Sequence, residues 1–191
     1  MKFEHVLVQM KDRMPEKRYI HTKGVAITAV HLAKKYGEDI DKAELAGILH
    51  DSVKYAEKEW LREKIISEKM DHNLLEYHHE LWHAPVGSYV AEHEFQIHDE
   101  DILNAIKYHT TGRAGMSPLE KIIYISDMIE PSRNYPGVEL LREKAEIDLE
   151  EAMISCMVHS MTFLIDKKQP VFPDSFHCYN DLIQKKGKVN E

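Results

Sequence analysis

The sequence predicts an all-α protein that folds as one compact domain. Apolar residues recur at helical spacing along most of the chain, start and stop signals flank these stretches, and no useful length alternates apolar with polar residues. With 191 residues and 43% hydrophobic content, the chain can bury one core of ordinary size. We expect an N-terminal segment at 1–14, the main domain at 15–167, and a C-terminal tail at 168–191 whose short helix packs on the domain.

The first long helix is predicted between Pro15 and Tyr36. Proline suits the first turn of a helix, and Gly37 is typical of a C-terminal stop. His21 falls on the same stripe of this helix as the apolar Leu32. Its imidazole is therefore expected to face the core.

The middle of the chain carries further helix signals. Asp41 and Glu44 resemble a capping box that opens a second helix, which is expected to continue to about Tyr55. Four more amphipathic stretches are predicted to be helical, at roughly 57–69, 72–81, 85–95 and 99–108.

The clearest helix start lies in the second half of the chain. Ser117 is a good N-cap, Pro118 suits the first helical position, and Glu120 suits the third. This helix is expected to end at Pro131, because proline cannot continue it. The last helices are predicted near 138–147, 148–167 and 175–186.

Composition excludes several classes of function. The net charge of −8 counts against non-specific nucleic-acid binding, which needs a basic face, although a small polyphosphate is compatible if a metal or local cations supply charge. No apolar run is long enough to span a membrane, and the N-terminus does not resemble a signal peptide. Cys156 and Cys178 fit free thiols in a reducing cytosol. We therefore expect a cytoplasmic protein without a membrane or nucleic-acid partner, and leave its oligomeric state open, with a homodimer as one option.

A set of histidines and aspartates has the composition of a metal site. Its members are His21, the doublet His50–Asp51, His83, His109 and Asp127. Neighbouring residues on a helix point about 100° apart, so the doublet can reach one metal from two directions, and Lys54 shares its face and can meet a bound anion. Imidazole and carboxylate ligands suit Fe, Mn, Zn, Ni or Co, and the lack of thiolates disfavours structural zinc.

The segment from His79 to His83 also spells HExxH, the motif of zinc proteases. In those enzymes one continuous helix carries both histidines. Pro85 follows His83 by two residues, so Ala84 should leave the α region and a new helix should start there instead. We therefore reject the protease interpretation.

The doublet and its companions resemble the HD superfamily of metal-dependent phosphohydrolases, whose pattern is H…HD…D. Four segments in order resemble, more narrowly, the YqeK family of symmetrical diadenosine tetraphosphate hydrolases: 83–95 (HAPVGSYVAEHEF), 107–113 (KYHTTGR), 117–127 (SPLEKIIYISD) and 129–138 (IEPSRNYPGV). The resemblance covers roughly 15–167. The core pattern is unbroken.

The resemblance implies roles for individual residues. The metal ligands would be His21, His50, Asp51 and Asp127, with His83 and His109 completing a second metal position or lining the phosphate end of the site. Together with Lys54, which the helical spacing places beside the doublet, we expect Asp51, His83 and His109 to form the catalytic set. The substrate-binding set would be His21, Asp51, His83, His109, Thr110, Asp127 and Arg133. The metal would be iron, Fe²⁺ or Fe³⁺, with Mn²⁺, Co²⁺ or Ni²⁺ as substitutes.

The implied reaction is the symmetrical hydrolysis of diadenosine tetraphosphate (Ap4A) to two ADP by a metal-activated water. ADP or GDP should then bind as a product. One alternative is another HD phosphohydrolase acting on a deoxynucleotide, a cyclic nucleotide or an alarmone. Ser52-Val53-Lys54 after the doublet lacks the acidic pair of alarmone hydrolases. A second alternative is a nucleotide sensor that keeps the metal but turns over slowly.

Overall fold

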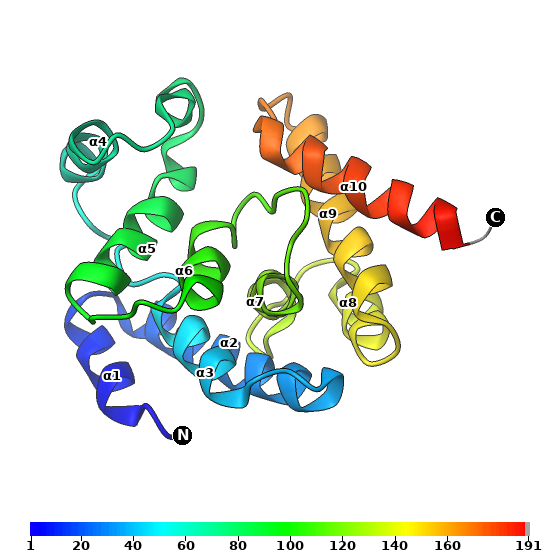
Figure 1. Cartoon of the computed structure of the whole chain (residues 1–191), viewed down its shortest axis with the longest axis horizontal. Helices are drawn as coiled ribbons and strands as arrows, with labels where there is room; N and C mark the ends of the chain where they lie inside the picture. Colours follow the sequence, from blue (N-terminus) through cyan, green and yellow to red (C-terminus); the bar gives the residue numbers. More distant parts are fainter. Residues whose placement is uncertain (190–191) are drawn as a thin grey trace.

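Helices α2 (Glu16–Tyr36) and α3 (Ile40–Leu49) pack against each other along one side of the fold (Figure 1). Gly37, in the left-handed region at φ 78°, ends α2 as predicted. At Gly47 of α3, an added Cβ would lie 2.8 Å from Ala26 Cα of α2. The two helices approach so closely because this position has no side chain.

The computed structural model describes residues 1–189, and within that range it contains helices and no strands. The other α-helices are α1 (Glu4–Gln9), α4 (Lys58–Ser67), α5 (His83–His93), α6 (Glu100–Lys107), α7 (Pro118–Ile129), α8 (Val138–Ala145), α9 (Leu149–Asp166) and α10 (Pro173–Val189). Three short 3₁₀ helices are η1 (Met10–Asp12), η2 (His72–Glu76) and η3 (His79–Leu81). The prediction of a single all-α domain is confirmed.

Helix α7 runs through the middle of the fold between α2, α6 and α9 (Figure 1). Its start is the predicted one, because Ser117 Oγ accepts a hydrogen bond from the Glu120 amide. Ile122, Ile123 and Ile125 are fully buried in the main core. Helix α7 is therefore packed firmly in the core, and its polar residues are held in fixed positions with little access to water.

The predicted second helix is wrong at both ends. Asp39 caps α3 by accepting hydrogen bonds from the amides of Asp41 and Lys42, so Asp41 is inside the helix. The helix ends at Leu49 rather than near Tyr55. The chain then passes through tight turns, in which the amides of Ser52, Lys54 and Ala56 bond to carbonyls three residues back. Apolar spacing continues beyond Leu49, but these turns replace the helical hydrogen bonds.

The stretch at 72–81 is not one amphipathic helix. It forms η2 and η3, which are separated by Tyr77 in an extended conformation. The indole of Trp82 donates a hydrogen bond to the Leu74 carbonyl at 2.8 Å and folds the segment back on itself. This segment, α4 and α5 enclose a second, smaller core around Ile65 and Val90.

The predicted break after His83 is also wrong in position. Helix α5 starts at His83, with Ala84 and Pro85 inside its first turn. A proline fits there because the first amides of a helix have no partner within it. The chain is interrupted earlier, at Trp82 between η3 and α5.

Both ends of the described chain pack on the bundle. Leu7 and Met10 of the N-terminal segment join the main core, and so do Cys178 and Leu182 of α10. Helix α10 is longer than the short helix predicted near 175–186. Residues 190–191 of the predicted tail lie outside the described residues.

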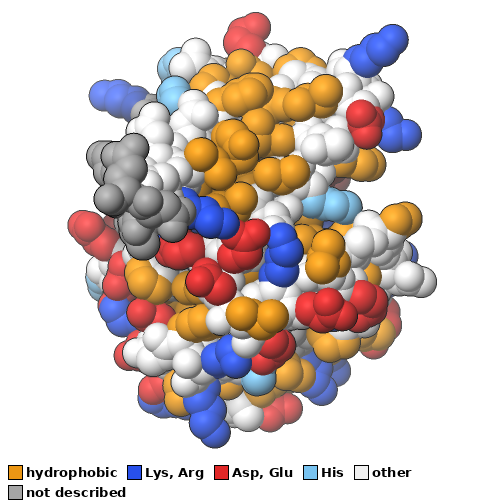
Figure 2. Space-filling view, turned by 90° about the vertical axis from the view of Figure 1, so that its right-hand side faces the viewer, with side chains coloured by type: hydrophobic (Ala, Val, Ile, Leu, Met, Phe, Trp, Pro, Cys, Tyr) orange, Lys and Arg blue, Asp and Glu red, His pale blue; other side chains and the backbone are white. Residues whose placement is uncertain are grey.

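Hydrophobic side chains gather on the side of the molecule shown in Figure 2. Helices α9 and α10 carry exposed apolar residues, among them Val158, Phe163, Phe176 and Ile183. Between residues 1 and 189, no helix combines the length and the apolar character that crossing a membrane requires.

Candidate metal centre

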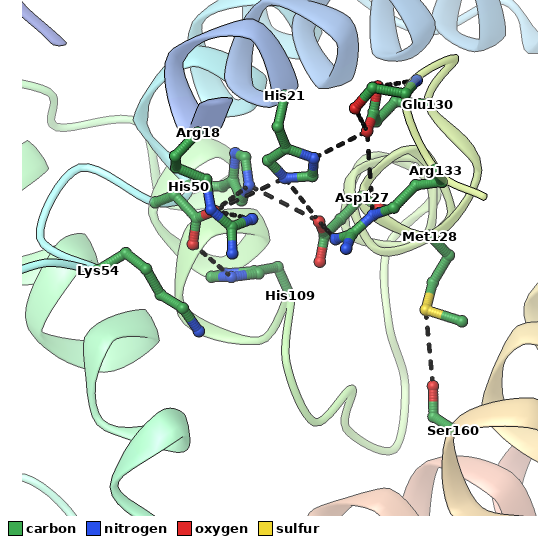
Figure 3. A network of polar contacts seen from close by, with 12 residues as sticks. Arg18, His21, His50, Lys54, His109, Asp127, Met128, Glu130, Arg133 and Ser160 are labelled. Atoms are coloured by element: carbon green, nitrogen blue, oxygen red, sulfur yellow. Dashed lines mark hydrogen bonds and ion pairs between the residues drawn. The ribbon is translucent and has the colours of Figure 1, made fainter. Parts of the chain in front are cut away.

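Three helices bring the predicted ligands of the first metal position together (Figure 3). His21 comes from α2, Asp127 from α7, and the doublet from the end of α3 and the turn after it. His21 Nε2 lies 3.0 Å from Asp127 Oδ1 and 3.7 Å from Asp51 Oδ2, while His50 Nε2 lies 3.0 Å from Asp51 Oδ2. Because α3 ends at Leu49, the two side chains of the doublet converge on one point rather than sharing a helix face.

The second oxygen of Asp51 faces a different pair of histidines. His83 Nε2 lies 3.1 Å and His109 Nε2 lies 3.8 Å from Asp51 Oδ1, and these two nitrogens are 3.1 Å apart. Asp51 thus stands between two groups whose donor atoms lie within 4.8 Å of one another: His21 with His50, and His83 with His109. All five residues are buried.

Backbone and carboxylate partners orient the imidazoles. The Nδ1 atoms of His50 and His109 each lie 2.7 Å from a backbone carbonyl, of Gly47 and Ile106 respectively. An N–H donated there leaves the lone pair of Nε2 pointing into the cluster. In both contacts Nδ1 is the donor, because a carbonyl oxygen can only accept a hydrogen bond.

A buried carboxylate orients His21. Glu130 Oε1 lies 3.0 Å from His21 Nδ1, and Ser132 donates to the same carboxylate through its amide and hydroxyl groups. Gly24, one turn after His21, makes room for this carboxylate, since an added Cβ would lie 2.4 Å from Glu130 Oε2. The pair thus has the form of the carboxylate–histidine–metal arrangement common in metal sites.

The electrostatics of the cluster favour ionised carboxylates. Burial would raise the pKa of Asp51, but His50 and His83 hold that pKa well below its ordinary value. Burial would likewise raise the pKa of Asp127, and His21 and Arg133 hold it well below its ordinary value. Burial, together with the charges of His50 and His83, lowers the pKa of His109 to about 3, so this imidazole is neutral at physiological pH.

The donor set fits a divalent cation. The buried atoms His21 Nε2, His50 Nε2 and Asp51 Oδ2 make no hydrogen bond of good geometry among the described residues, although they converge and have charged neighbours. A buried polar atom left without a partner costs about 1–3 kcal/mol. Coordination of one cation would satisfy all three atoms, and mixed nitrogen and oxygen ligands suit a divalent transition metal.

Two arginines contact the aspartates. Arg18 lies 2.9 Å from Asp51 Oδ2, and Arg133 pairs with Asp127 through its guanidinium group (Figure 3). Our sequence reasoning missed both Arg18 and Glu130. Arg18 precedes His21 by three residues on one helix, a spacing that could have indicated a shared face, whereas no local signal marked Glu130 as a partner of His21.

The other predicted residues are more dispersed. Lys54 pairs with Glu80 and sits across the cluster from Arg133 in Figure 3. Thr110 lines a separate pocket beside Tyr89 and Tyr108, so its phosphate contact stays a prediction. His79 of the HExxH segment belongs to neither group of donor atoms, in line with the rejection of a protease site.

This helical fold, with an H…HD…D set converging on one point, defines an HD domain protein, and the model of the HD domain family matches residues 18–132. The chain is 50% identical to the symmetrical bis(5'-nucleosyl)-tetraphosphatase of Bacillus subtilis, over 96% of this chain and 98% of that protein. It is 49% identical to the protein of that name from Halalkalibacterium halodurans, over 91% and 93% of the two chains. The chain therefore belongs to the HD domain family and, within it, to the family of these symmetrical tetraphosphatases, as the sequence motifs predicted.

A solved structure has the same fold. It is described as a predicted HD superfamily hydrolase involved in NAD metabolism from Clostridium acetobutylicum. The two chains superpose with a TM-score of 0.90 at 39% identity, covering 96% of this chain and 97% of the other. The likeness extends over nearly the whole chain, including the regions outside 18–132.

Proposed function

We propose that this chain hydrolyses Ap4A symmetrically to two ADP. The observation that carries the proposal is the position of Asp51, whose two carboxylate oxygens face two separate pairs of histidines. One water is consumed: its oxygen bonds to one of the two central phosphorus atoms, and the bridging oxygen leaves with the other ADP. The protons of the water are released.

The metal ligands in this proposal are His21, His50, Asp51 and Asp127, and His83 with His109 provides a second position. A bound divalent metal would supply Lewis acidity toward a phosphoryl oxygen and a lowered pKa for water. We propose iron as the resident metal, since imidazole and carboxylate ligands suit it, with Mn²⁺, Co²⁺ or Ni²⁺ as substitutes.

Side chains around the proposed metal position would bind the phosphates and stabilise the developing charge. Lys54 and Arg133 can bind the phosphates and offset the charge that builds on the equatorial and leaving oxygens. His109 is neutral because of its low pKa, and so its Nε2 lone pair can ligate a cation without first losing a proton. The buried position of the cluster excludes bulk water, which strengthens each of these contacts.

Product analysis tests the proposal. The metal-loaded chain is incubated with Ap4A, and the nucleotides are separated by chromatography, with Fe²⁺, Mn²⁺, Co²⁺ and Ni²⁺ compared and a chelated sample as control. We expect ADP as the sole product and the highest turnover with iron. Release of AMP plus ATP, or no hydrolysis with any metal, would refute the proposal.

We also propose a cytoplasmic location and a homodimer for the enzyme. Cys156 and Cys178 are free and buried, as expected in a reducing cytoplasm, and the exposed apolar residues of α9 and α10 are compatible with a homodimer. Light scattering on the purified chain measures the oligomeric state directly.

A further inference from the structure

Two pockets flank the buried cluster of histidines and aspartates, and both have Arg18 and Tyr55 in their walls. The first, called here the α4 pocket, has a volume of about 600 Å³ and includes His83. The second, the α7 pocket, has a volume of about 450 Å³ and includes His21. Both volumes fall within the range of roughly 300–1,000 Å³ that is typical of small-molecule sites.

Each pocket meets a different side of the cluster. His83 in the α4 pocket contacts Asp51 through Oδ1, and His21 in the α7 pocket faces Asp51 Oδ2. A linear ligand that passes over Asp51 can therefore place one end in each pocket. Such a ligand would cross from one pocket to the other past Arg18 and Tyr55, which line both pockets.

Both pockets and their boundary contain cations, although Lys54 pairs with Glu80 and Arg133 with Asp127. Lys54 and Lys58 line the α4 pocket together with three glutamates, and Lys17 and Arg133 line the α7 pocket together with Glu130. These positions suit two diphosphate groups, one on each side of the cluster.

Arg18 at the boundary is held in place from two sides. Its side chain is 19% exposed and pairs with Asp51 at 2.9 Å. It also hydrogen-bonds with the side chain of Tyr55. The guanidinium group, which stays protonated in proteins, is therefore fixed where the two pockets meet.

We propose that the two pockets hold the two nucleoside diphosphate halves of one dinucleoside tetraphosphate, and that Arg18, supported by Tyr55, binds its central phosphates. This inference rests on the proposed function and adds to it the placement of the substrate and a phosphate-binding residue. Two equal halves on either side of Asp51 leave the central P–O–P bridge over the cluster. Cleavage at that bridge then yields two ADP.

Isothermal titration of ADP into the metal-loaded chain tests this arrangement. We expect two ADP bound per wild-type chain. Lys54→Met and Arg133→Met should each reduce the number to one, because each lines one pocket only. Arg18→Met should weaken both binding events by about 10-fold to 100-fold, the loss typical of one hydrogen bond to a charged group.

Two more variants complete the design. Tyr55→Ala should also weaken both events, and it is expected to fold because Tyr55 is 53% exposed. This variant keeps the test decisive if Arg18→Met is unstable in thermal unfolding. Arg62→Met is the matched control, since Arg62 is exposed on α4 outside the residues that line the two pockets, and it should bind two ADP with wild-type affinity.

Two results would overturn the inference. One is a wild-type chain that binds a single ADP. The other is an Arg18→Met chain with altered metal affinity but two unchanged ADP sites, which would make Arg18 only a counter-ion of Asp51. The proposed function fails separately: a chain that binds two ADP but does not cleave Ap4A contradicts the reaction and leaves the two pockets standing.

Discussion

Glu130 lies with its Oε1 atom 3.0 Å from Nδ1 of His21, although the two residues are 109 positions apart. Glu130 is 1% exposed, and α2 leaves room for it only because residue 24 is a glycine. A carboxylate behind a metal-binding imidazole fixes its tautomer and raises its basicity. The pair therefore determines how well His21 can serve as a ligand.

Replacing Glu130 with glutamine should weaken metal binding about 10-fold to 100-fold, the usual cost of losing such a partner. The measurement is a competition titration against a chelator of known affinity. Glu146→Gln is the matched control, because Glu146 contacts the exposed His31 at 2.7 Å on the surface. Equal metal affinities in the two variants would show that Glu130 does not act through His21.

Gly24→Ala should have a similar effect by a steric route. The new Cβ would lie 2.4 Å from Glu130 Oε2, the mobile end of a side chain, so the carboxylate should move while the fold persists. Metal affinity should fall, and the melting temperature should stay near that of wild type. Gly187→Ala, where the new Cβ meets open space, should change neither quantity appreciably. Unchanged metal affinity in the Gly24 variant would argue against the steric account.

Asp51 and Asp127 should differ in how many metals they hold. Asp51 faces both groups of histidines, while Asp127 faces only the first. Asp51→Asn should therefore remove the bound metal at both positions, and Asp127→Asn should weaken only one. Metal content per chain, measured by atomic emission after gel filtration, distinguishes them. An Asp51→Asn chain with wild-type metal content would contradict a bridging role.

Metal affinity should rise with pH. Burial would lower the pKa of His50, but Asp51 raises it above its ordinary value, so the metal-free chain holds a proton there at low pH. A metal must displace that proton, and affinity should increase about tenfold per pH unit below the raised pKa and level off above it. His109 has a pKa of about 3, so above pH 5 it holds no extra proton that a metal would have to displace.

Calorimetry of metal binding in buffers with different heats of ionisation counts the released protons. We expect about one proton near pH 6 and fewer as the pH rises above the raised pKa of His50. Metal affinity that does not change across this range would contradict the predicted protonation of His50.

The two thiols should be inert in the native chain. Burial raises the pKa of Cys156 to about 12 and that of Cys178 to about 11, so very little thiolate exists at pH 8. A disulfide reagent should react slowly with the folded protein and rapidly with both thiols in denaturant. Fast labelling of the native chain would show that these cysteines are more accessible than the structure indicates.

Local sequence signals were sufficient to predict the boundaries of some helices. The start of α7 was predictable because Ser117, Pro118 and Glu120 act within one turn. The end of α3 was not, since apolar spacing runs on past Leu49 while the backbone changes to tight turns. The position of the break near Pro85 was missed for a similar reason: a proline is tolerated in the first turn, and the sequence does not say where that turn begins.

The sequence by itself determined the class of site, because the doublet His50–Asp51 and the order of its motifs carry recognisable chemistry. Only the tertiary structure decided that Glu130 stands behind His21 and that Arg18 reaches Asp51. Such contacts join separate elements, and they depend on how closely helices pack, as where Gly47 meets α2. Spacing along the chain constrains neighbours within one helix, whereas contacts between helices depend on the packing of the whole core.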